Sequence, residues 1–125
     1  MNKRRILLVD DDPGITRSIQ LNLETTGRYE VKTENFSGNA FAVARRFKPD
    51  LILLDVMMPG TDGGDVAAQV RASEDLRNTP IIFLTAIVSK RETGGHESTL
   101  GSMPFLAKPV EWSRLLKSIE EHIGK

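Results

Sequence analysis

The chain has 125 residues, which is enough for one domain with a substantial core and too few for two domains of ordinary size. It has no cysteine, so disulfides, zinc–thiolate sites, thiol nucleophiles and iron–sulfur clusters are excluded. Seventeen basic and seventeen acidic side chains give a formal net charge of zero. Such a balance provides no electrostatic basis for binding nucleic acid or an anionic membrane directly.

The N-terminus begins like a secretory signal but does not continue as one. Lys3, Arg4 and Arg5 precede an apolar run at residues 6–9, and the run stops at three aspartates. A secretory core needs about 7–15 apolar residues, and a membrane span needs about 20. Because neither length occurs in the chain, the sequence predicts a cytoplasmic protein without a membrane segment.

Short apolar runs predict the strands. Each run is continuous and bounded by polar or turn residues, which is typical of strands buried on both faces of a parallel sheet. These runs are residues 6–9, 51–54, 81–84 and 105–107. Residues 29–33 alternate apolar and polar side chains instead, so this strand is expected nearer an edge of the sheet.

Helical patterns separate the strands. N-terminal caps are expected at Asp12, Ser37 and Asp62, and Gly27 is a plausible stop for the first helix. Residues 112–123 carry an amphipathic stripe that predicts the last helix.

Glycine-rich segments have the weakest patterns. Residues 88–102 contain Gly94-Gly95 and few apolar side chains, so any helix there is expected to be short or frayed. Gly60, Gly63 and Gly64 are interpreted as turn residues that permit positive φ.

The alternation of strand and helix predicts an α/β fold. We expect one domain over residues 1–125, with a doubly wound parallel sheet of five strands and helices on both faces. Right-handed crossovers bring the carboxyl ends of parallel strands to one edge, where such folds bind ligands.

Chemically useful side chains follow four of these strands. Asp10-Asp11-Asp12 follow the first, Asp55 follows the third, and Thr85 and Lys108 follow the fourth and fifth. Clustered carboxylates repel one another unless a cation lies between them, and oxygen ligands favour Mg²⁺ before Ca²⁺. An aspartate can also carry a phosphoryl group covalently. The pattern therefore predicts a Mg²⁺-assisted phosphoryl-transfer site, with lysine and hydroxyl groups around the phosphoryl oxygens.

Four sequence blocks together resemble the response-regulator receiver domain of two-component signalling. The blocks are Val9-Asp10-Asp11-Asp12-Pro13, Leu54-Asp55-Val56-Met57-Met58-Pro59-Gly60, Leu84-Thr85-Ala86 and Ala107-Lys108-Pro109. The resemblance covers essentially the whole chain and implies the flavodoxin-like strand order 2-1-3-4-5.

The resemblance implies a role for each acidic residue. Asp55 resembles the phosphoacceptor, and Asp11 a direct metal ligand. Asp10 resembles a second acidic residue that acts directly or through water, and the backbone carbonyl of Met57 a further ligand. Asp12 is expected to be the cap of the first helix.

The resemblance also implies switch residues. Thr85 resembles the hydroxyl that follows the phosphoryl group, and Phe105 the aromatic side chain that turns inward with it. Lys108 resembles the lysine of the family, and Pro109 the residue whose preceding peptide bond is commonly cis. Met57 and Ile87 occupy positions that tune water access, and we expect both to prolong the phosphorylated state.

The implied function is regulatory, and not that of an enzyme acting on other substrates. The chain would take a phosphoryl group from a histidine kinase or a histidine phosphotransfer protein and would catalyse only its own phosphorylation and dephosphorylation. Phosphorylation would change the face formed by residues 88–102, residues 105–107 and the last helix, and thereby control a partner or an output domain. No output domain is expected within residues 1–125, and a homodimer through the same face is allowed.

Two alternatives remain at the level of sequence. A haloacid-dehalogenase-like phosphatase would use Asp10 as its nucleophile, but it would require threonine or valine where this chain has Gly14. A receiver without phosphorylation chemistry would serve only as a docking scaffold, and the complete set of site residues argues against that reading.

Overall fold

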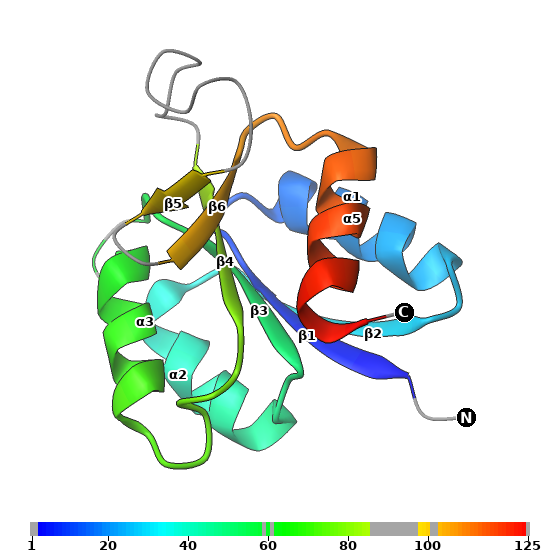
Figure 1. The fold of residues 1–125 in the computed structure, drawn as a ribbon. Coiled ribbons are helices and arrows are strands. Elements are labelled where there is room, and N and C mark those ends of the chain that lie inside the picture. Colours follow the sequence, from blue (N-terminus) through cyan, green and yellow to red (C-terminus); the bar gives the residue numbers. More distant parts are fainter. Residues whose placement is uncertain (1–2, 59, 61, 86–97, 101–102, 125) are drawn as a thin grey trace.

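The computed structural model describes residues 3–58, 60, 62–85, 98–100 and 103–124, and strands alternate with helices through most of them (Figure 1). The elements in chain order are β1 (Arg4–Val9), α1 (Pro13–Thr25), β2 (Tyr29–Glu34), α2 (Ser37–Phe47), β3 (Leu51–Asp55), α3 (Gly63–Ala72), β4 (Ile81–Thr85), β5 (Ser98–Leu100), β6 (Met103–Ala107) and α5 (Trp112–Ile123). No helix in these ranges is both long enough and apolar enough to span a membrane.

The strands form a single sheet in the order β2-β1-β3-β4-β6-β5. All neighbours from β2 to β6 pair in parallel, whereas β5 pairs antiparallel with β6. The fifth parallel strand in chain order is the one labelled β6, so the parallel strands confirm the expected order 2-1-3-4-5. The strand β2 lies at an edge of the sheet, as its alternating sequence predicts.

The strand β5 was not predicted from the sequence. Ser98 pairs with Phe105, and Leu100 pairs with Met103, so β5 exists through its antiparallel pairing with the strand that follows it. Any helix in residues 88–102 was expected to be short or frayed, and within that stretch residues 98–100 form a strand instead of a helix. The remainder of that stretch, including residues 88–97, lies outside the described residues.

Two apolar cores lie on opposite faces of the sheet. Successive side chains of a strand point to opposite faces, so Leu7 and Val9 join one core while Ile6 and Leu8 join the other. The first core packs against α2 and α3, and the second against α1 and α5. Figure 1 shows the two helix pairs on either side of the sheet.

Two of the three predicted helix caps are confirmed. The Asp12 carboxylate accepts hydrogen bonds from the N–H groups of Gly14 and Ile15, and the Asp62 carboxylate accepts one from Asp65. The cap expected at Ser37 is wrong, because Ser37 is the first residue of α2 and Phe36 is the N-cap. The Phe36 carbonyl already accepts a hydrogen bond from the N–H of Asn39, which starts the helix one residue earlier.

The loop glycines have different roles. Gly60 adopts positive φ, as expected. Gly27 also has positive φ, and it directly follows Thr26, the C-cap of α1, so it lies at the expected stop of the first helix. The expectation of positive φ is wrong for Gly63 and Gly64, which lie in the first turn of α3. At Gly63 the requirement is close approach, since an added Cβ would lie 2.4 Å from the carbonyl oxygen of Asp55. This contact seats α3 directly against the end of β3.

Candidate functional site

The carboxyl ends of the parallel strands bring the predicted site residues to one edge of the sheet. Asp10 follows β1, Asp55 is the last residue of β3, and Thr85 is the last residue of β4. Lys108 follows β6, and its backbone N–H donates a hydrogen bond to the Thr85 carbonyl at 2.7 Å. The structure therefore places these residues at the edge where open α/β sheets bind ligands.

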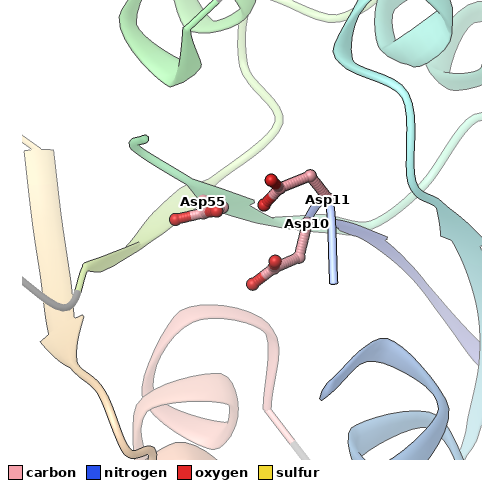
Figure 2. A group of neighbouring side chains, drawn as sticks. All are labelled: Asp10, Asp11 and Asp55. Atoms are coloured by element: carbon pink, nitrogen blue, oxygen red, sulfur yellow. The ribbon is translucent and has the colours of Figure 1, made fainter. Parts of the chain in front are cut away.

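Three carboxylates form what we call the acidic cluster: Asp10, Asp11 and Asp55. One oxygen of each lies within 4.8 Å of the others. Figure 2 shows the three side chains as neighbours, with Asp55 coming from β3 and the other two from the end of β1. Asp10 and Asp55 are buried while Asp11 is exposed, so the cluster reaches solvent on the side of Asp11.

Lys108 compensates part of the negative charge. Its Nζ donates a hydrogen bond to Oδ2 of Asp10 at 2.6 Å and lies 3.4 Å from Oδ1 of Asp55. Burial opposes the charged form, but the hydrogen bond and the two carboxylates outweigh it and raise the pKa of Lys108 above its usual value. Lys108 therefore stays protonated at neutral pH.

Asp55 lies in an environment that resists ionisation. Burial, followed by the charge of Asp10, raises the pKa of Asp55 to about 6 despite the opposing effect of Lys108. The backbone N–H of Met57 also lies 3.4 Å from Oδ1 of Asp55. At neutral pH the carboxylate is mostly ionised and thus able to act as a nucleophile, but at a cost in free energy.

The donor set fits a hard divalent cation. Three carboxylates and one ammonium leave two negative charges in excess, which a divalent cation balances. Carboxylate oxygens without sulfur or imidazole ligands are the chemistry that Mg²⁺ prefers, together with retained waters. The acidic cluster of this chain is therefore consistent with a Mg²⁺ site next to a phosphoacceptor aspartate.

The roles of the other predicted site residues stay predictions. Thr85 and Phe105 are buried. The Met57 side chain is 59% exposed, whereas the neighbouring Met58 belongs to a core. The Lys108–Pro109 peptide bond is cis, as expected. Of the family-like blocks, Pro59 and Ala86 lie outside the described residues, as does Ile87.

Sequence reasoning missed two residues beside the acidic cluster. The side-chain amide of Asn35 donates hydrogen bonds to the Asp10 carbonyl at 2.8 Å and to the Thr16 hydroxyl at 3.0 Å. The available signal was positional: Asn35 directly follows β2, and thus lies at the same edge of the sheet.

Comparisons with known proteins agree with this geometry. Residues 6–120 match the family model of the response regulator receiver domain. Among curated proteins, the transcriptional regulator RpaA of Synechocystis is 36% identical over 118 residues, and PilH of Pseudomonas aeruginosa is 34% identical over 115 residues; each alignment covers 92% of this chain. The solved receiver domain of the sensor histidine kinase PA1611 of P. aeruginosa, with magnesium in its active-site cleft, has a TM-score of 0.80 and 31% identity, and the match covers 99% of this chain and all of that one.

The relatives differ in length. The match spans 47% of RpaA but 93% of PilH, so this chain corresponds to a part of the first and to nearly all of the second. The family match extends over almost the entire sheet and includes every described member of the site. The chain belongs to the response regulator receiver domain family.

Proposed function

We propose that this receiver domain accepts a phosphoryl group on Asp55 from the phosphohistidine of a histidine kinase or of a histidine phosphotransfer protein. The observation that carries the proposal is the convergence at Asp55. Its buried carboxylate ends β3 within reach of Lys108 and of two further carboxylates. Phosphoryl transfer needs mainly positioning and charge neutralisation, and both are provided here.

The proposed step is an in-line displacement at phosphorus. A carboxylate oxygen of Asp55 forms the new P–O bond as the P–N bond of phosphohistidine breaks, and the bonding electrons remain on the imidazole nitrogen. The product is a mixed anhydride, which water later hydrolyses. Lys108 lies beside Asp55 and offers N–H donors to the transferred oxygens. Bound Mg²⁺ would supply positive charge next to the same oxygens.

Within this proposal the acidic residues have separate roles. Asp11, the exposed member of the cluster, holds Mg²⁺ directly, while the buried Asp10 acts directly or through water and orients Lys108. The carbonyl of Met57, two residues after Asp55, is a further ligand.

The proposed output is a change in the surface around β6 and α5. A phosphoryl group adds about −1.5 to −2 charges and strong acceptor oxygens. We expect the Thr85 hydroxyl to turn toward it and the Phe105 ring to fill the vacated space. Because Thr85 ends β4 and Phe105 lies in the neighbouring β6, this movement would change the part of the proposed output face that β6 forms.

The proposed module works in the cytoplasm and controls a protein partner or a further domain. RpaA is named as a DNA-binding regulator, and PilH matches this chain over nearly its full length. The balanced charge of this domain favours protein contact over direct contact with nucleic acid or a membrane. A homodimer through the face of β6 and α5 is one form that this contact could take.

Phosphorylation by a small phosphodonor tests the proposal. The purified chain is incubated with acetyl phosphate with and without Mg²⁺, and the bound phosphoryl group is measured by intact mass. We expect one phosphoryl group per chain in the presence of Mg²⁺, and none after Asp55→Asn. Transfer from phosphorylated histidine kinases of the source organism, with the same variant as control, then identifies the donor.

Two outcomes would contradict the proposal. Equal labelling of Asp55→Asn and the unaltered chain would exclude Asp55 as the acceptor. Absence of labelling by acetyl phosphate and by every kinase would support the docking-scaffold alternative instead.

A further inference from the structure

A side-chain hydrogen bond from Asn35 replaces a backbone hydrogen bond that is missing where the pairing of β1 with β2 ends. The register of β1 and β2 pairs Val9 with Glu34, and the Asp10 N–H continues the ladder by donating to the Glu34 carbonyl. In a parallel ladder the next bond would run from the N–H of Phe36 to the Asp10 carbonyl. The N–H of Phe36 donates to the Glu34 carboxylate instead. The side chain of Asn35 supplies the donor that the Asp10 carbonyl would otherwise lack.

The second donor of the same amide reaches the first turn of α1. Thr16 is buried, and its hydroxyl donates to the Pro13 carbonyl at 3.1 Å, so it accepts the hydrogen bond from Asn35. The Asp10 carbonyl can only accept. Both contacts therefore require the NH₂ group of Asn35 to point toward the loop. One amide thus ties together the two ends of the loop that carries the aspartates.

The anchored peptide controls the direction of Asp11. The Asp10 carbonyl and the Asp11 N–H belong to one planar peptide unit, so fixing the carbonyl also fixes the plane from which the Asp11 side chain departs. Within the part of the chain that the structure describes, no group donates a hydrogen bond to the exposed Asp11 carboxylate. Its orientation toward the acidic cluster therefore depends on its backbone.

We propose that Asn35 is a positioning residue that pre-orients Asp11 for binding Mg²⁺. This inference rests on the proposed function, because it assumes that the acidic cluster holds the ion. Groups that orient metal ligands through hydrogen bonds typically contribute 10–100-fold in metal affinity. Since Asn35 acts through the backbone of its neighbour, we expect an effect at the lower end of that range.

The test compares Mg²⁺-dependent stabilisation in matched variants. Thermal unfolding of the whole chain is followed across a Mg²⁺ titration, and the increase in midpoint gives the Mg²⁺ dissociation constant, because a ligand of the folded state stabilises it by mass action. We expect Asn35→Ala to raise this constant about tenfold. The control Asn39→Ala, which alters an exposed asparagine in the adjacent helix, leaves it unchanged. A merely structural role would lower the midpoint equally with and without Mg²⁺ and would leave the constant unchanged.

A second pair of variants covers the case in which Asn35→Ala does not fold. Thr16→Val removes the acceptor of the second hydrogen bond while preserving shape, and Thr16→Ser retains the hydroxyl. We expect weaker Mg²⁺ binding in Thr16→Val and binding like that of the unaltered chain in Thr16→Ser. Equal dissociation constants for this pair would contradict the anchoring.

The outcomes separate the two proposals. If the unaltered chain is stabilised by Mg²⁺ and Asn35→Ala has the same dissociation constant, the positioning role is wrong and the proposed function stands. If the unaltered chain gains no stability from Mg²⁺ at any concentration, the metal site itself is wrong, and the positioning role fails with it.

Discussion

The charged side chains at the two ends of the parallel sheet differ in how far they are compensated by partners. At the carboxyl end, Asp10 and Asp55 are buried as like charges beside a single lysine. At the amino end, Arg28 pairs with Glu120 at 2.8 Å, and both side chains stay partly exposed. There, too, the backbone N–H of Arg5 donates to the Asp50 carboxylate.

This difference indicates that the amino end contributes to the stability of the fold, whereas the carboxyl end forms the candidate site. At the amino end, the Glu120 carboxylate is paired with an arginine and the Asp50 carboxylate accepts a backbone hydrogen bond, so both have partners within the fold. The carboxyl end retains two uncompensated negative charges, which lower stability unless a cation or a neutral variant relieves them. A cost that the fold itself does not offset indicates a site that is completed by something bound there.

The largest expected effect is a gain of stability on removing the Asp55 charge. The pKa of Asp55 is about 6 in the folded chain, against 3.8 ordinarily. The contribution of its neutral carboxyl group to the free energy of unfolding is therefore fully present below about pH 4 and is lost as pH rises toward 6. Without Mg²⁺ at pH 7–8, Asp55→Asn should therefore raise the free energy of unfolding by roughly 2–3 kcal/mol. The gain should vanish below about pH 4.

Urea unfolding across this pH range, in the presence of a chelator, measures the gain. Asp75→Asn is the matched control, because Asp75 is exposed and lies 3.9 Å from Arg45 in a surface pair. If Asp55→Asn is no more stable than the unaltered chain at pH 8, the ionised Asp55 carboxylate does not destabilise the fold, and this prediction is wrong.

Removing the lysine at the same end should have the opposite sign. Lys108→Met leaves Asp10 and Asp55 without their cation, so we expect a loss of about 2 kcal/mol in metal-free protein. Because Mg²⁺ provides alternative compensation, the loss should shrink as Mg²⁺ is added. A loss that is the same with and without the ion would mean that Lys108 and Mg²⁺ do not act on the same charges.

A smaller effect is expected on the lifetime of the phosphorylated state. Met57 places an exposed apolar side chain two residues after Asp55, where we expect it to restrict the approach of water. Met57→Asn should shorten the phosphoryl lifetime roughly threefold, equivalent to about 0.6 kcal/mol in the barrier. The rate of phosphoryl loss measures this, with Leu21→Asn as a control of similar exposure on α1. An unchanged lifetime would remove Met57 from this role.

The smallest effect is expected at the amino end. Arg28→Met breaks the ion pair with Glu120, but exposed pairs contribute little to stability because water and salt screen them. The loss should be well below that of Lys108→Met and independent of Mg²⁺. A double-mutant cycle with Glu120→Gln measures the coupling energy between the two side chains. A coupling energy that varied with Mg²⁺ would contradict the expectation that only the carboxyl end responds to the ion.

Local sequence was sufficient for most of the fold. Each buried strand is a continuous apolar run, and the caps at Asp12 and Asp62 precede clear helical patterns, so these elements could be predicted. The strand β5 could not, because a three-residue strand depends on pairing with β6. The role of Gly63 likewise depends on the closeness of Asp55, a tertiary contact without a local signal.

The candidate site divides in the same way. Asp10, Asp55, Thr85 and Lys108 were predictable because strand ends in a parallel sheet converge at one edge. The contacts of Asn35 were not, since they depend on the N–H of Phe36 turning away from the ladder to the Glu34 carboxylate. Charged side chains at strand ends can be recognised from the sequence. A side chain that replaces a missing backbone hydrogen bond between two strands cannot, because the missing bond is seen only in the structure.

Mapping the phosphorylated residue decides whether Asp55 is the phosphoacceptor. The chain is phosphorylated with acetyl phosphate in the presence of Mg²⁺ and reduced with borohydride, which converts an aspartyl phosphate to homoserine, and the digested peptides are sequenced by mass spectrometry. We expect homoserine at position 55 and nowhere else. Homoserine at position 10, with Asp55 unaltered, would contradict this expectation and would favour a phosphatase-like nucleophile at the end of β1.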